Sequence, residues 1–132
     1  MAQATAQAIT RLNPPTMPNS VQLGYSQISI VEPGRMAYVS GQVAVPPDGG
    51  PVPADLGEQV RLAAANARAA LDALGATPAD IVILRCFMTD LNAETLAEVF
   101  PAVVAFFDGA MPCLTGVGVA ALAGADLKVE LE

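Results

Sequence analysis

Residues 55–89 read DLGEQVRLAAANARAALDALGATPADIVILRCFMT. Asp55 can accept a hydrogen bond from the backbone at the start of a helix, and Glu58 stands three residues later, as in a capping box. Apolar residues then recur every three or four positions until Gly75 ends the pattern. The stretch therefore predicts an amphipathic helix over 55–75 and, after a short turn, a buried strand over 81–89 that is rich in β-branched and apolar residues.

The predicted strand has two unlike faces, because successive side chains point to opposite sides of a sheet. The wholly apolar face, which we expect beneath the helices, consists of Val82, Leu84, Cys86 and Met88. The other face carries Arg85 and Phe87. A buried Arg needs a carboxylate or several acceptors, so we expect Arg85 to approach Glu130, which lies on a predicted strand near the chain end.

The segments before the helix predict a β-hairpin. Residues 26–31 and 36–40 have strand character, and Pro33-Gly34 between them suits a tight turn. Residues 1–20 contain Pro14, Pro15 and Pro18 and are predicted to be an extended or irregular lead-in. Residues 21–132 then form a single domain, because a chain of this length supports one core.

The segments after the central strand predict another helix and two strands. The helix follows Asn92 and contains Pro101, which should kink it or mark its restart. Residues 115–120 and 127–132 alternate like strands. We expect four apolar residues of these strands to face the helices, namely Val117, Val119, Val129 and Leu131. We expect Gly116 and Gly118 on the opposite face, beside Arg85, Phe87 and Glu130.

This order of elements predicts an α+β sandwich, in which a mixed sheet carries two helices on one face. The other sheet face has no cover within one chain. Hydrophobic residues make up 53% of the 132 residues and charged residues only 14%. A small chain with so many apolar residues and so few charges is expected to bury its uncovered sheet face against a partner subunit.

Composition also excludes several functions. The chain has no His, so a Ser-His-Asp or Cys-His mechanism is excluded within one chain. The net charge of −7 argues against a nucleic-acid partner. No apolar run is long enough to span a membrane, and the first ten residues do not read as an export signal. The two Cys have no metal-binding spacing, which predicts a reducing, cytoplasmic location without disulfides.

Several stretches, in order, resemble the Rid family of RidA-like or YjgF-like proteins. They are 24–27 (GYSQ), 38–42 (YVSGQ), 87–91 (FMTDL), 112–119 (PCLTGVGV) and 129–132 (VELE). Helix 64–75, before a Pro-Ala-Asp-Ile-Val strand, matches as well. The resemblance implies a chorismate-mutase-like fold in a homotrimeric barrel, with ligand clefts between subunits. It also implies hydrolysis of reactive enamines and imines, such as 2-aminoacrylate, without a metal or organic cofactor.

One family position is altered here. Active members carry an Arg in the stretch Pro-Ala-Arg-Ser/Thr, where this chain has Leu114 in the stretch 112–115. That Arg grips the substrate carboxylate by two parallel hydrogen bonds, which a Leu cannot make. Losing one member of a desolvated charge pair costs about 2–5 kcal/mol, or tens-fold to thousands-fold. The chain therefore resembles a branch of the family with weak or changed deaminase activity.

The resemblance implies a set of site residues. Glu130 corresponds to the glutamate thought to orient or activate the hydrolytic water. Tyr25 and Ser40, with its neighbour Gly41, correspond to cleft residues. Arg85, Phe87, Leu114, Thr115 and Gly116 complete the predicted ligand-binding set, and no metal site is expected.

Alternatives remain for the site. Glu130 is either a cleft carboxylate or a solvated strand charge, and Arg85 is either a ligand-binding cation or half of a structural ion pair. Tyr25 either donates to a ligand or anchors the lead-in.

The predicted ligand is a small carbonyl compound, an imine or an aromatic acid. The function is hydrolytic deamination in a homotrimer or, alternatively, non-catalytic binding of a small molecule, with RNA cleavage disfavoured by the charge.

Overall fold

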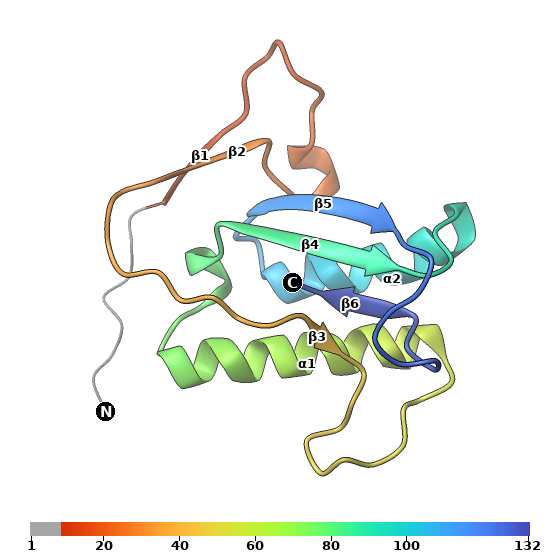
Figure 1. Ribbon diagram of the computed structural model, residues 1–132. Helices are drawn as coiled ribbons and strands as arrows, with labels where there is room; N and C mark the ends of the chain where they lie inside the picture. The colour runs from red at the N-terminus through yellow and green to blue at the C-terminus, as the bar shows by residue number, and fades with distance from the viewer. Residues whose placement is uncertain (1–8) are drawn as a thin grey trace.

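Two helices pack on one face of a mixed four-stranded sheet, as predicted, and a separate two-stranded hairpin stands beside them (Figure 1). The computed structural model describes residues 9–132. The strands are β1 (Ile9–Leu12), β2 (Ile28–Val31), β3 (Gln42–Val43), β4 (Ile83–Met88), β5 (Cys113–Gly118) and β6 (Val129–Leu131). The helices are α1 (Leu56–Leu74) and α2 (Ala93–Phe107), with single turns η1 (Val21–Leu23) and η2 (Pro78–Asp80).

The helix ends follow their sequence signals. The Asp55 carboxylate accepts a hydrogen bond of 2.9 Å from the Glu58 N–H, and Gly75 ends α1 in the left-handed conformation. Asn92 caps α2 by accepting from the N–H groups of Glu94 and Thr95. The helix α2 continues through Pro101 without a restart, with Pro101 on its exposed side.

The core lies between the helices and the four-stranded sheet, whose order is β3-β6-β4-β5. The strands β4 and β5 are parallel, and the other neighbours are antiparallel. Buried core residues come from both helices and the sheet: Val60, Ala63, Leu71, Leu84, Cys86, Met88, Val99, Val103, Phe106, Phe107, Val129 and Leu131. The prediction that Leu84, Cys86 and Met88 of β4 and Val129 and Leu131 of β6 face the helices is therefore confirmed, whereas Val82 precedes β4 and is only partly buried.

The predicted hairpin between 26–31 and 36–40 is wrong. The strand β2 pairs instead with β1, from Ile9 opposite Val31 to Leu12 opposite Ile28, and residues 32–41 contain no strand. Of the lead-in predicted over residues 1–20, residues 1–8 lie outside the described residues, and residues 9–12 form β1. Residues 9–12 and 36–40 both have strand character, so local strand preference does not predict which of them pairs with β2. The pairing depends on which segment the tertiary structure places beside β2.

The predicted orientation of β5 is also wrong. Parallel pairing sets Leu84 opposite Leu114, Cys86 opposite Gly116 and Met88 opposite Gly118. Because residues in register share a face, both glycines lie on the side of the helices. Val117 is in register with Phe87 and lies on the uncovered face.

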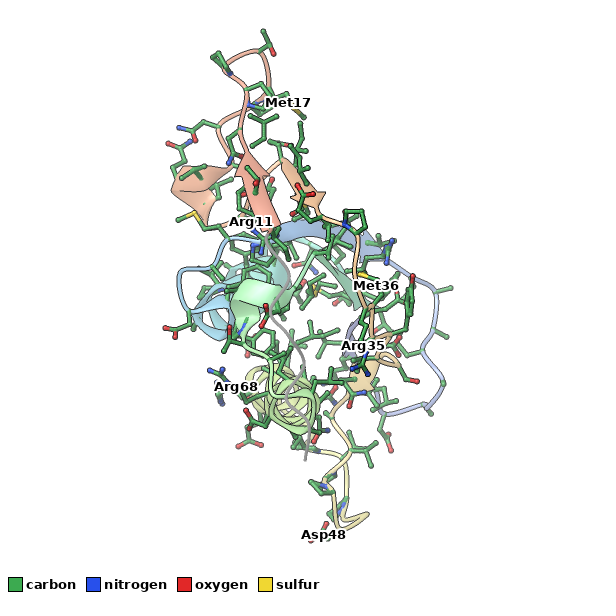
Figure 2. The ribbon with its side chains drawn as sticks, turned by 90° about the vertical axis from the view of Figure 1, so that its left-hand side faces the viewer. Arg11, Met17, Arg35, Met36, Asp48 and Arg68 are labelled. Atoms are coloured by element: carbon green, nitrogen blue, oxygen red, sulfur yellow. The ribbon has the colours of Figure 1, made fainter. Side chains whose placement is uncertain are left out.

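The hairpin β1–β2 is attached at the start of β4 and β5. Figure 2 shows it projecting from the rest of the molecule, with Arg11 at the junction. Arg11 donates to Ser29 Oγ at 2.6 Å and to the Ile81 carbonyl at 2.7 Å, and Ser29 Oγ donates to the Val82 carbonyl at 2.9 Å. Partial burial lowers the pKa of the Arg11 guanidinium. No helix within residues 9–132 is long and apolar enough to cross a bilayer.

Candidate functional site

The uncovered sheet face centres on Glu130. The middle residue of β6, Glu130, is half-buried and in register with Phe87 of β4 on one side and Val43 of β3 on the other. Its carboxylate lies over the backbone of Gly41, where an added Cβ would come within 2.6 Å of Glu130 Cδ. An added Cβ would displace the end of the flexible Glu130 side chain, so the present position of this carboxylate depends on Gly41.

Arg85 lies on the same face but does not pair with Glu130. Its Nη1 forms an ion pair of 3.2 Å with Glu132 Oε1, and the two side chains are 48% and 45% exposed. Arg85 and Glu132 exchange both backbone hydrogen bonds, at 2.7 and 2.8 Å, which places their side chains next to each other. The expected Arg85–Glu130 approach is therefore wrong, because Glu130 is opposite Phe87.

Thr115 and Ser40 border this face. Thr115 is exposed and in register with Arg85. Ser40 is exposed on the strandless segment and lines a hollow of about 660 Å³, to which Arg85 also contributes. The hollow extends from the uncovered face to the helices, where Leu71 and Phe106 line it.

The remaining predicted site residues lie on the other side of the sheet. Leu114 is half-buried against the core. Tyr25 also packs on the core, with its ring edge-on to Phe100 at a centroid distance of 6.4 Å. Gly116 is exposed, and a Cβ added there would meet nothing within 4 Å.

The structure thus divides the predicted site into two groups. The first group, on the uncovered face, contains Gly41, Arg85, Phe87, Thr115 and Glu130, and Ser40 lies next to it at the hollow. The second group, on the helix side beside the β5 edge, contains Tyr25, Leu114 and Gly116. The sheet separates the groups within one protomer, so a site that uses both needs two copies of the chain.

Gln59 positions the strand that carries Glu130, and sequence reasoning missed it. Its fully buried amide donates to the carbonyls of Pro53 and Asp126, both at 2.8 Å, and accepts from the Lys128 N–H at 2.9 Å. The sequence signal for this role is a polar residue on the apolar face of the helix, between Leu56 and Val60, because a buried polar side chain needs hydrogen-bond partners. Glu132, the partner of Arg85, was also missed.

The thiols offer no cluster for a metal. Within the described chain, no group of three or more His, Cys, Asp or Glu residues could hold an ion, and both Cys are free. Burial raises the pKa of the Cys86 thiol to about 11. Cys113 is half-buried, with its Sγ 3.2 Å from Ser29 Oγ.

Comparison with known proteins gives consistent matches. A family model described as endoribonuclease L-PSP matches residues 17–132. The TdcF protein of Escherichia coli (strain K12) is 39% identical over 106 residues, which cover 77% of this chain and 79% of that protein. The 2-iminobutanoate/2-iminopropanoate deaminase of the same organism is 38% identical over 103 residues, which cover 77% and 80%.

Solved structures share the fold. YyfB from Yersinia pestis, a Rid-family protein of unknown function, superposes with a TM-score of 0.87 at 36% identity, covering 93% of this chain and 94% of that one. Escherichia coli TdcF with bound serine superposes with a TM-score of 0.62 at 36% identity, covering 70% of this chain and 72% of that one.

Proposed function

Because this chain belongs to the Rid (YjgF-like) family, which the matching model describes as endoribonuclease L-PSP, we propose that it binds a small metabolite in clefts between the subunits of a homotrimer. In these clefts Glu130 supports a weak or altered hydrolysis of an enamine or imine. The single observation that carries the proposal is the half-buried Glu130 carboxylate held over Gly41 on a sheet face that no element within residues 9–132 covers.

The division of the site supports a cleft between subunits. The group around Glu130 and the group around Leu114 lie on opposite sides of one sheet. The outer edge of β5 has no strand partner along Leu114–Gly118 in the described chain, so a second copy can approach there. In the proposed cleft, the β5 edge of one protomer, with Tyr25, Leu114 and Gly116, meets the uncovered face of the next. That face carries Gly41, Arg85, Phe87, Thr115 and Glu130, with Ser40 next to it.

Glu130 is suited to acid–base work on water. As water attacks the imine carbon and the C–O bond forms, the carboxylate accepts a proton from that water. The carboxyl group passes this proton to the nitrogen, which gives a carbinolamine. The hydroxyl proton of the carbinolamine then moves through the same carboxylate to the nitrogen, the C=O bond forms as the C–N bond breaks, and ammonia and a carbonyl compound leave. Phe87 beside Glu130 provides an apolar wall that limits competing water, while Tyr25 or Ser40 orients the ligand by a hydroxyl group.

Leu114, in place of the carboxylate-binding Arg, limits the expected rate of imino-acid hydrolysis. Its aliphatic side chain packs toward Leu84 and the core and offers no donor to a substrate carboxylate. The ion pair of Arg85 with Glu132 supports a structural role for this cation over ligand binding. Turnover of imino acids should therefore be lower than that of a relative with the Arg by tens-fold to thousands-fold.

An assay with freshly generated 2-aminoacrylate tests the proposal. Wild-type protein should release ammonia slightly above the buffer rate, and Glu130→Gln should remove that increment. Leu114→Arg should raise the rate at least tenfold, because a guanidinium can hold the carboxylate bidentately. Rates equal to buffer for both the wild type and Leu114→Arg would contradict the catalytic proposal.

The alternative is a trimer that binds a metabolite without turnover, and the packed Leu114 is the observation that favours it. TdcF has been crystallised with serine, so small amino and keto acids belong in the ligand panel together with aromatic acids. A thermal shift with one of these acids, lost in Glu130→Gln and unaccompanied by ammonia release, would support this alternative. No thermal shift with any compound would count against it.

Two further expectations belong to this proposal. We assign no RNA-cleaving activity, because the net charge of −7 repels a phosphate backbone and the chain has no His. We place the protein in the cytoplasm, which suits two cysteines that are both free.

A further inference from the structure

Two amide side chains of the helix α1 are directed at the strands beside Gly41 and Glu130. Gln59 and Asn66 are seven residues apart, or about two helical turns, so they project from the same face of α1. Gln59 holds the turn before β6 through its buried hydrogen bonds. Both β3 and β6 lie against α1 (Figure 1), and Asn66 is directed at β3.

Asn66 holds the end of β3. Its Nδ2 donates to the carbonyls of Val43 and Val45, both at 3.0 Å, so each of the two amide protons has an acceptor. The Val45 N–H also donates to the Val43 carbonyl at 2.9 Å, which turns the chain sharply out of the sheet. The amide of Asn66 therefore fixes the place at which β3 leaves the sheet.

The end of β3 is next to the candidate carboxylate. Val43 is directly opposite Glu130 in the ladder with β6. Gly41 precedes Val43 by two residues and lies on the same face, where the Glu130 side chain rests on its backbone. The position of the carboxylate therefore depends on how β3 lies relative to β6.

The two amides hold the two sides of this contact. Asn66 binds β3, which adjoins Gly41, and Gln59 binds the turn that leads to Glu130. β3 is an edge strand of the described sheet and pairs with β6 alone, so its place also depends on the helix behind it. Because both amides belong to one helix, they fix the position of the two strands relative to each other.

The same amides also bracket the loop between β3 and α1. Asn66 binds the carbonyl of Val45 at the start of the loop, and Gln59 binds that of Pro53 at its end. Figure 2 shows Asp48 at the outer tip of this loop. Changes at the tip are therefore separated from Gly41 by the hydrogen bonds of Asn66.

We propose that Asn66 is a positioning residue for Glu130: it holds β3 from behind and thereby keeps the backbone of Gly41 beneath the carboxylate. The inference rests on the proposed function for its effect on hydrolysis, whereas the position of the carboxylate is measurable without activity. At neutral pH neither Ala nor Asp at position 66 can donate to the two carbonyls, so in both variants β3 should shift and the Glu130 side chain should move with it.

Nuclear Overhauser spectroscopy tests the position of the carboxylate. Glu130 Cγ is 3.0 Å from the point where a Cβ on Gly41 would lie, so the Glu130 Hγ and Gly41 Hα protons should give a strong signal. We expect this signal to fall at least threefold in Asn66→Ala and in Asn66→Asp. Asp48→Ala, at the tip of the same loop, is the matched control and should keep the wild-type signal.

Val103→Ala separates positioning from stability. Val103 is a core residue of α2, 1% exposed, and its truncation destabilises the protein while both amides of α1 remain. We expect the wild-type signal between Gly41 and Glu130 in this variant. The proposal is overturned by an unchanged signal in both Asn66 variants or by an equal fall in Val103→Ala. Loss of folding in both Asn66 variants would also overturn it, because Asn66 would then support the whole fold.

The kinetics of ammonia release test the chemical consequence. In a Leu114→Arg background with 2-aminoacrylate, Asn66→Ala should lower kcat at least tenfold and leave KM within twofold, because the carboxylate transfers protons during hydrolysis. Val103→Ala should leave both constants within twofold. An unchanged kcat in Asn66→Ala would overturn the role of Asn66 in hydrolysis. No ammonia from the background protein would contradict the proposed function alone, and the proton signal would still decide whether Asn66 positions the carboxylate.

Discussion

Glu130 and Gly41 show how a single missing side chain can create a candidate site. The carboxylate occupies the space that a Cβ at position 41 would fill. The resemblance to the Rid family identified both residues, yet their contact depends on β3 lying beside β6. Arg85 likewise forms its ion pair with Glu132, because residues directly opposite each other on antiparallel strands have neighbouring side chains.

Gly41→Ala should force the Glu130 carboxylate out of its position. We expect a loss of at most about 1 kcal/mol in the free energy of unfolding, measured by urea denaturation, because the added methyl group displaces only the end of the flexible Glu130 side chain. Gly116→Ala is the control for stability and should change it by less than about 0.5 kcal/mol, since nothing lies within 4 Å of its Cβ. In the double variant Gly41→Ala with Glu130→Ala, most of the loss should be recovered. Additive losses would show that the two residues are not in contact.

The Cys86 thiol makes stability depend on pH at the alkaline end. Burial raises its folded pKa to about 11 from the ordinary value of 9.0, so the folded state disfavours the thiolate. This contribution is present below pH 9 and is lost as the pH rises from 9 to 11, by about 1–3 kcal/mol. The difference in unfolding free energy between the wild type and Cys86→Ala should therefore narrow over that range. A constant difference would contradict burial of this thiol.

At the scale of elements, β6 depends on a side chain from α1. The Gln59 amide joins the loop before α1 to the turn before β6, and Glu130 follows two residues after Lys128. The prediction of α1 from sequence was accurate because capping and apolar spacing are local signals. The role of Gln59 could not be predicted from local signals, because its hydrogen-bond partners are up to 69 residues away in the chain.

Gln59→Leu should destabilise the protein by about 2–4 kcal/mol. The apolar replacement keeps the volume but leaves two carbonyls and one N–H without their buried partner. Chemical denaturation measures the loss, and amide exchange at Lys128 should accelerate with it. Gln22→Leu, at an exposed position, is the control and should be nearly neutral. A neutral Gln59→Leu would show that the amide is not needed to hold β6.

At the scale of the whole molecule, one sheet face stays bare. Phe87, Val117 and Val43 lie on the same face as Glu130, and no element of the described chain covers them. Both helices are on the opposite side, and the hairpin β1–β2 is attached at the start of β5 (Figure 1). The two halves of the candidate site can meet only if another copy covers this face.

The protein should therefore sediment as a trimer, with three times the mass of the 13.5 kDa chain. Val117→Asp places a charge on the bare face beside Phe87 and should yield a monomer that retains its far-UV circular dichroism. Ala69→Asp, at an exposed position of α1, is the control and should remain trimeric. A monomeric wild type would remove the basis for a cleft between subunits.

The sequence by itself determined both helices, their caps and the buried strand β4, because these depend on interactions within a few residues. It also indicated the residue types of the candidate site through the family resemblance. Only the tertiary structure decided that β2 pairs with β1, that Gly116 and Gly118 lie toward the helices, and that Arg85 pairs with Glu132. Segments 9–12 and 36–40 have similar local preference for strand, and Gly-Val alternation has no intrinsic orientation. Which strands pair, and in which register, depends on contacts between residues far apart in the chain.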